Sequence, residues 1–228
     1  MKKIAILQSN YIPWKGYFDL IAAVDEFILY DDVQFTKSDW RNRNKIKTPK
    51  GVEWLTIPVG QNINRLIRDV ELPRTDWQSK HWKTLEANYQ RALHFEEIAT
   101  MLKPVYLEPH ARLTDLNRSF IEKICTYLAI PTAIRYSWDY EAATGRNERL
   151  VDLCLQAGAN QYISGPSARG YLDVEMFNKN NIEVRWFEYE GYPPYAQLWG
   201  AFTHQVSIID LLFNCGGNAS QYMKCGRR

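Results

Sequence analysis

Residues 4–32 read IAILQSNYIPWKGYFDLIAAVDEFILYDD, and this stretch decides the fold class. Two short apolar runs, residues 4–7 and 27–30, have the character of strands that are buried on both faces. Between them, the apolar residues of 18–24 follow Pro13 at near-helical spacing. A strand, a helix and a second strand predict a right-handed βαβ unit whose two strands are parallel.

The ends of these two strands indicate where a ligand binds. In parallel α/β sheets, ligands occupy the crevice beyond the carboxyl ends of the strands. The polar and aromatic residues that follow the two predicted strands are therefore candidate site residues: Gln8, Ser9, Asn10, Tyr11, Trp14, Asp31 and Asp32.

The rest of the chain predicts further strands and helices. We expect extended segments at residues 46–47, 54–59, 67–72, 132–136, 162–164 and 184–187. We expect helices at residues 77–93, 95–102, 113–128, 148–155, 171–179 and 204–213. Asp115 and Asn117 are candidate early-turn or capping residues of the third of these helices. The alternation predicts an α/β fold with a doubly wound, mainly parallel, Rossmann-like sheet. We expect one domain over residues 1–228, in which residues 40–130 form an inserted hairpin and helices.

Charge and cysteine content narrow the class of partner. The 28 Lys and Arg residues nearly balance 26 Asp and Glu residues, so bulk electrostatics do not indicate a nucleic-acid partner. The four cysteines lack metal-site spacing, and whether Cys215 and Cys225 interact stays open. No signal peptide is evident, and no run approaches the roughly 20 apolar residues of a membrane span. We therefore expect a cytoplasmic protein that binds small molecules and has no dedicated metal site. The sequence does not indicate its oligomeric state.

Two short motifs are similar to those of the nucleotidylyltransferase superfamily. Gly16-Tyr17 stands where that superfamily has a Gly-His pair at the start of a helix, which contacts nucleotide phosphates. Residues 163–169, ISGPSAR, resemble its late phosphate-binding motif, in which a serine, helix-start amides and a basic residue hold ATP. Tyr17, unlike the histidine of that superfamily, cannot carry a positive charge toward a phosphate. The alternative for residues 163–169 is a simple turn and helix cap.

A basic stretch follows the second predicted strand and could flank the same opening. Its polar and charged residues are Gln34, Lys37, Arg41, Asn42, Arg43, Asn44, Lys45 and Lys47. Arginine offers a planar fork suited to phosphate or carboxylate. The alternative is a solvated loop. Asp31 and Asp32 could hold Mg²⁺ or an amine, or could cap a turn. The histidines are interpreted as packed or surface residues, and His204 as a helix cap.

Several segments together resemble the WbqC-like family, which occurs with bacterial surface-polysaccharide gene sets. They are QSNYIPWKGYF at residues 8–18, DDVQ at 31–34, NRNKI at 42–46, YISGP at 162–166 and DLLFN at 210–214. Family members more often have Pro where this chain has Ser9. The resemblance implies modification of an amino sugar by attachment of glycine or another amino acid during O-antigen synthesis.

The resemblance and the motifs together suggest a hypothesis: the protein forms an amide on a nucleotide-linked amino sugar. In this hypothesis ATP activates the acyl group, and Mg²⁺ is a further candidate cofactor. The residues expected to bind ATP are Gln8, Asn10, Tyr11, Gly16, Tyr17, Ser164 and Arg169. The residues expected to contact the sugar substrate are Trp14, Gln34, Arg41 and Asn44. Arg43, Lys45 and Asp32 are the expected catalytic residues. Two alternatives are acyl transfer from a preactivated donor, such as aminoacyl-tRNA or a carrier thioester, and a non-catalytic sugar-nucleotide-binding protein.

Overall fold

Five parallel strands form the central sheet of the computed structural model, which describes residues 1–141 and 143–227. In spatial order they are β5 (Ala133–Tyr136), β2 (Glu26–Leu29), β1 (Lys3–Leu7), β6 (Gln161–Ser164) and β7 (Glu183–Trp186). Every neighbouring pair runs parallel. The mainly parallel, Rossmann-like sheet predicted from the sequence is confirmed. The strand order reverses between β1 and β6, and such a reversal opens a crevice at the carboxyl ends of the strands.

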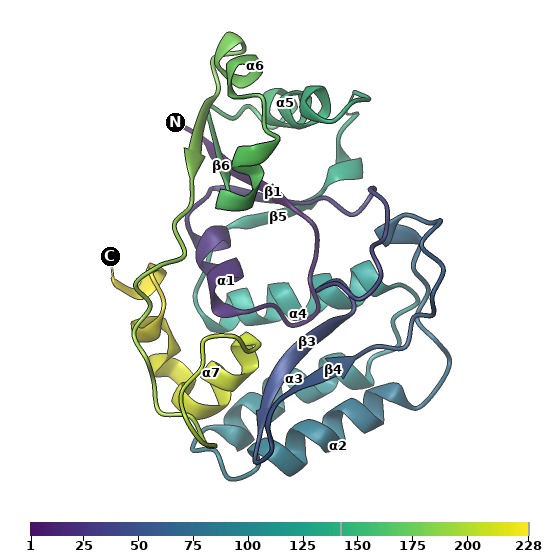
Figure 1. Cartoon of the computed structure of the whole chain (residues 1–228), viewed down its shortest axis with the longest axis vertical. Coiled ribbons are helices and arrows are strands. Elements are labelled where there is room, and N and C mark those ends of the chain that lie inside the picture. The colour runs from purple at the N-terminus through teal and green to yellow at the C-terminus, as the bar shows by residue number, and fades with distance from the viewer. Residues whose placement is uncertain (142, 228) are drawn as a thin grey trace.

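Helices cover both faces of this sheet (Figure 1). Helices α1 (Lys15–Ala22) and α4 (Leu113–Tyr127) lie on one face, and α5 (Asn147–Gln156) and α6 (Val174–Lys179) lie on the other. The alternation of side chains along each strand explains the two layers. Ile4 and Ile6 pack in the hydrophobic cluster that includes α5, whereas Ala5 packs in the cluster that includes α1 and α4.

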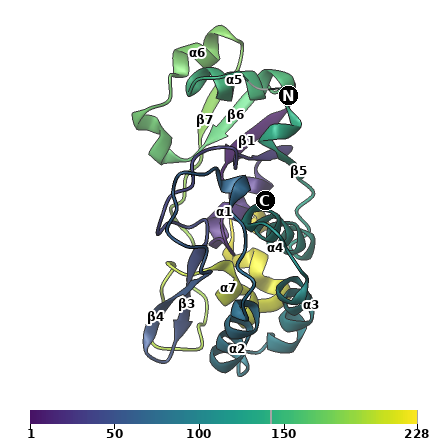
Figure 2. The same ribbon diagram turned by 90° about the vertical axis from the view of Figure 1, so that its right-hand side faces the viewer.

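The hairpin and the remaining helices lie at the opposite end of the molecule from α5 and α6 (Figures 1 and 2). They comprise β3 (Arg43–Thr48), β4 (Gly51–Thr56), α2 (Trp77–Tyr89), α3 (Phe95–Leu107) and α7 (Ile208–Cys215). Their apolar residues belong to the same hydrophobic cluster as α1 and α4. This shared core does not separate residues 40–130 from the rest of the chain. The predicted single domain with an insertion at residues 40–130 stays a prediction.

Several predicted elements differ from the structure. The helix predicted at 95–102 continues to Leu107, and the helix predicted at 77–93 ends at Tyr89. Residues 67–72 are not a strand but begin with a 3₁₀ helix, Ile67–Asp69, because backbone bonds close within that turn. The helix predicted at 171–179 begins only at Val174, where the Asp173 side chain accepts a hydrogen bond from the Met176 amide. The final helix begins at Ile208, because Ser207 and not His204 caps it.

Two smaller expectations concern single residues. Asp115 lies in the first turn of α4 as expected, but Asn117 neither caps the helix nor faces solvent. Its side chain points inward and donates to the Ser9 hydroxyl and to the Arg41 carbonyl. Cys215 and Cys225 are both free thiols.

A chain of buried hydrogen bonds joins the hairpin to the loop after β1. The Tyr11 hydroxyl lies 2.6 Å from the Tyr106 hydroxyl and 2.8 Å from Nδ1 of His81, whose Nε2 lies 3.1 Å from the Thr56 carbonyl oxygen. A carbonyl oxygen can only accept, so Nε2 carries the proton and Nδ1 accepts from Tyr11. Burial lowers the pKa of His81 to about 4, so the ring is neutral at pH 7.

Acid should destabilise the protein through His81. Its pKa rises from about 4 in the folded state to an ordinary 6.5 on unfolding, so the unfolded chain binds the extra proton between these values. The contribution of neutral His81 to the free energy of unfolding is complete above pH 6.5 and is lost as the pH falls from 6.5 to about 4. The loss is about 2–3 kcal/mol. Urea unfolding near pH 7 and near pH 4.5 should show a smaller acid loss for His81→Asn than for the unaltered protein. Equal losses would contradict the assignment.

Candidate functional site

A chamber of about 680 Å³ opens where the strand order reverses. We call it the larger chamber. Gln8 and Asn10, which follow β1, line one side, and Ser164 and Gly165, at the end of β6, line the other. This is the position at which open parallel sheets bind ligands. A cavity therefore lies at the strand ends where residues 4–32 predict a ligand site, and ligand binding there stays a prediction.

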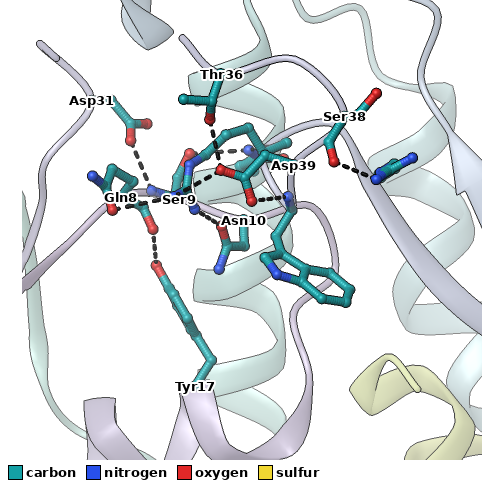
Figure 3. Close-up of polar contacts among 12 residues, drawn as sticks. Gln8, Ser9, Asn10, Tyr17, Asp31, Thr36, Ser38 and Asp39 are labelled. Carbon is teal, nitrogen blue, oxygen red and sulfur yellow. Dashed lines mark hydrogen bonds and ion pairs between the residues drawn. The ribbon is translucent and has the colours of Figure 1, made fainter. Parts of the chain in front are cut away.

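Buried hydrogen bonds hold the loop after β1 in place. The carboxylate of Asp31 is fully buried and accepts from the Ser9 amide at 2.7 Å and from the Thr114 hydroxyl at 2.5 Å. Figure 3 shows Gln8, Ser9 and Asn10 between Asp31 and Tyr17, whose hydroxyl donates to the Gln8 carbonyl at 3.0 Å. Burial raises the pKa of Asp31, and its bonds to Ser9 and Thr114 oppose that rise. The loop is thus preorganised before any ligand arrives.

Arg41 reaches across this loop from the segment before the hairpin. Its guanidinium donates to the side-chain oxygens of Asn10 and Gln8 and pairs with Asp39 at 3.6 Å. It lines the larger chamber and is mostly buried. The guanidinium is thus fixed by two neutral amides and by one carboxylate at the long end of the ion-pair range, and it remains a hydrogen-bond donor for an anionic ligand.

Two more arginines line the larger chamber from the start of α5. Arg149 forms an ion pair with Asp32, which also accepts from the Ser137 hydroxyl at 2.5 Å. Arg146 stacks on the Tyr171 ring at 4.0 Å. Among the residues that the structure describes, no carboxylate lies within ion-pair distance of Arg146. Among the described residues, these three arginines form ion pairs with two carboxylates, Asp39 and Asp32, so the chamber favours an anion.

A second, smaller chamber of about 480 Å³ adjoins the first. Asn10, Trp14 and Trp40 line both chambers, so these three residues mark their junction. Lys45 from β3 and His204 from the loop before α7 line only the smaller chamber. The two chambers together form one cleft with a cationic half and a more apolar half.

Comparison with known proteins assigns the chain to a family. A family model described as the WbqC-like protein family matches residues 8–222. The chain belongs to the WbqC-like family. This WbqC-like protein is also 55% identical over 231 residues to the uncharacterized protein Rv1507c of Mycobacterium tuberculosis, and the match covers the whole of both chains. No solved structure matches it. The resemblance stated from the sequence is confirmed.

Much of the sequence that identifies this WbqC-like protein as a family member has a structural role. Asn44 donates to the carbonyls of Tyr11 and Ile12 at 3.0 and 2.9 Å, and the Ser207 hydroxyl donates to the same Ile12 carbonyl at 2.6 Å. Ile12 has a φ of +37°, a strained value for a β-branched residue. These two donors hold the strained turn in place, and with it the wall of both chambers.

The cleft brings together eight of the residues predicted as site residues. Those lining one or both chambers are Gln8, Asn10, Trp14, Tyr17, Arg41, Asn44, Lys45 and Ser164. Six others lie outside the lining: Tyr11, Gly16, Asp32, Gln34, Arg43 and Arg169. Burial raises the pKa of Tyr17 well above its usual value, and its hydroxyl is bound to Gln8, so it supports the loop.

The residues outside the lining have other contacts. Tyr11 is buried in the hydrogen-bonded chain described above, and Asp32 pairs with Arg149. Gln34 is exposed and donates to the Ile63 carbonyl at 3.4 Å. Arg43 donates to the Ser38 carbonyl and stacks on Trp54. Arg169 is exposed and stacks on Trp186 at 5.0 Å, so the cation expected from residues 163–169 points elsewhere.

Gly16 is covered by the Trp14 indole and is not open to a phosphate. A methyl group at Gly16 would lie 2.4 Å from a ring carbon of Trp14. Gly16→Ala should therefore displace the indole from the chamber junction and lower the free energy of unfolding by about 1–3 kcal/mol. Gly217→Ala is the matched control, because its methyl group meets nothing within 4 Å. Urea unfolding checks both, and a shift no larger than that of the control would refute the packing role of Gly16.

The sequence did not predict that Arg146 and Arg149 line the larger chamber, nor that His204 lines the smaller one. A signal for the arginines was present: they open a helix that follows a parallel strand, and such helix starts face the ligand edge. His204 was hidden because the final helix was expected to begin there.

The donor set does not fit a metal held by the protein alone. Among residues 1–141 and 143–227, no three His, Cys, Asp or Glu side chains gather closely enough to hold an ion. Asp32, one of the two carboxylates for which Mg²⁺ binding is one of several roles predicted from the sequence, is engaged by Arg149 and Ser137. Within the same ranges, no helix combines the length and apolarity that a membrane crossing needs.

Proposed function

We propose that this WbqC-like protein forms an amide on the amino sugar of a nucleotide-linked sugar, in the synthesis of a bacterial surface polysaccharide such as O-antigen. One observation carries the proposal: Arg41, Arg146 and Arg149 line one chamber at the carboxyl edge of a parallel sheet. The chain belongs to the WbqC-like family, and the choice of an amino sugar as the acceptor rests on what that resemblance implies.

The larger chamber suits a nucleoside diphosphate sugar. A guanidinium group can donate two parallel hydrogen bonds to two oxygens of one phosphate. The hydroxyl of Ser164 adds a further donor at the end of β6. Trp14, Tyr171 and Tyr189 supply ring surfaces on which a base or a sugar can stack. The volume of about 680 Å³ lies within the usual range of small-molecule sites, about 300–1,000 Å³. With the diphosphate beside the arginines, the sugar extends toward the junction with the smaller chamber.

Two routes can supply the acyl group. In the first, an amino acid carboxylate attacks ATP, pyrophosphate leaves, and the acyl adenylate then reacts with the sugar amine. In the second, the acyl group arrives already activated as an ester or thioester. The positions of Gly16 and Arg169 favour the second route, because two of the groups expected to hold ATP phosphates lie outside the chamber lining.

The assay for this function uses purified protein and uridine-diphosphate-linked and thymidine-diphosphate-linked amino sugars. Each sugar is incubated with glycine and ATP–Mg²⁺, or with glycyl thioester or glycyl-tRNA, and products are resolved by mass spectrometry. We expect a product that gains the glycyl group, with AMP released only on the first route. Tight binding of the sugar nucleotides without an amide from any donor would contradict amide formation and identify a non-catalytic binding protein.

A further inference from the structure

The smaller chamber contains ionisable side chains that nucleotide-sugar binding does not use. Lys45 and His204 line it from two separate segments, β3 and the loop before α7. These segments are fixed together, because the Ser207 amide donates to the Lys45 carbonyl at 2.8 Å. The smaller chamber adjoins the larger one, because Asn10, Trp14 and Trp40 line both. A ligand that extends past this junction would place its far end near Lys45 and His204.

His204 is held among aromatic rings and is uncharged near neutral pH. The Phe202 ring meets the imidazole edge-on with centroids 4.5 Å apart, and the Tyr192 ring lies 6.3 Å away. Its Nδ1 is shielded from solvent and has no hydrogen-bond partner among the described residues. Burial lowers the pKa of His204, and the positive charge of Lys15 on α1 lowers it further. A neutral imidazole without a fixed partner is able to accept a proton.

Lys45 brings positive charge to the same space. Its ammonium lies 5.1 Å from the Trp54 ring centroid, and within the described ranges no carboxylate lies within ion-pair distance of it. A cation beside a reacting carbonyl stabilises the negative charge that develops on the carbonyl oxygen. Among the described residues, three ionisable groups are placed beside His204 by charge, shared lining or ring contact: Lys15, Lys45 and Tyr192. None of the three is a carboxylate that would favour a charged imidazole.

We propose that the smaller chamber is the acyl-transfer site, which receives the acyl carbonyl of an activated donor, and that His204 is the general base that takes the proton from the attacking sugar amine. This inference rests on the proposed function, because it needs an amine delivered from the larger chamber.

The step balances without any further reactant. The lone pair of the amine nitrogen forms the C–N bond to the carbonyl carbon, and Lys45 faces the oxygen on which negative charge collects. One proton passes from the nitrogen to His204. The bond from the carbonyl carbon to the leaving oxygen or sulfur then breaks, and its electron pair leaves with that atom. The leaving group takes up the proton from His204, directly or through water.

The test compares His204→Asn and His204→Gln with the unaltered protein, using glycyl donor and uridine-diphosphate-linked amino sugar. Both variants should bind the sugar nucleotide as the unaltered protein does, while kcat/KM for amide formation falls about 10²–10⁴-fold. The activity of the unaltered protein should rise with pH and level off below pH 6.5, the ordinary pKa of histidine. The variants should lack this titration. His110→Asn, which lies outside both chambers, should change neither property.

Each other outcome overturns the inference in a recognisable way. Variants that keep the rate and pH profile of an active unaltered protein would remove His204 from the chemistry and leave the proposed function intact. Variants that lose sugar-nucleotide binding together with activity would assign His204 a structural role. An unaltered protein that binds sugar nucleotides but makes no amide would refute the proposed function, and this inference with it.

Discussion

Arg146→Ala should weaken the binding of nucleoside diphosphates and nucleotide sugars by about 10–100-fold, because a charged hydrogen bond contributes about 1.5–3 kcal/mol. The substitution removes a guanidinium that stacks on the Tyr171 ring, and among the described residues it breaks no ion pair with a carboxylate. Binding by calorimetry in low and moderate salt checks the value. The weakening should be larger at low salt, where charge attraction is less screened.

Arg169→Ala is the matched control for this experiment. Arg169 lies in the stretch that resembles a phosphate-binding motif, but its guanidinium stacks on Trp186 outside the chamber. Its removal should leave the affinity within about twofold, corresponding to less than 0.5 kcal/mol. A large loss for Arg169→Ala together with no loss for Arg146→Ala would move the phosphate site away from α5 and contradict the site described here.

Asp31→Ala should lower the free energy of unfolding by about 2–5 kcal/mol, because it leaves the Ser9 amide and the Thr114 hydroxyl buried without an acceptor. The loop after β1 would also lose its tie to α4, so we expect weaker binding of nucleoside diphosphates. Urea unfolding measures the first effect and calorimetry measures the second.

Asp69→Ala provides the comparison, since Asp69 is half exposed and its contact with Arg68 is at 4.0 Å. A surface carboxylate of this kind should contribute no more than about 0.5 kcal/mol. If Asp31→Ala were as mild as Asp69→Ala, the buried network would not be what holds the loop.

The sheet and its two helical layers were predictable because they follow from local periodicity. Apolar runs of strand length alternate with helical patterns, and this alternation alone predicts a parallel sheet with helices on both faces. The boundary errors at the last two helices have one cause. Asp173 and Ser207 cap these helices, and each lies inside the range that apolar periodicity assigned to the helix.

The location of the cleft was predictable from the strand ends, but the residues that line it were only partly so. Gln8, Asn10 and Ser164 follow directly from the strand boundaries. Arg146 and Arg149 are brought to the chamber by strand order, which joins β6 to β1 and sets α5 above them. Strand order depends on packing between segments far apart in the chain, so residue spacing cannot reveal it. Side-chain direction is equally hidden, as Arg169 shows by stacking outward on Trp186.

We propose that the larger chamber binds the diphosphate of a nucleotide sugar. The most direct measurement is a crystal structure of the protein soaked with uridine diphosphate, supported by calorimetry with uridine, thymidine, guanosine and cytidine diphosphates. We expect at least one of them to bind saturably, with its phosphates in contact with Arg146, Arg149 and Ser164. Phosphates bound elsewhere, or no saturable binding of any of the four, would contradict the claim.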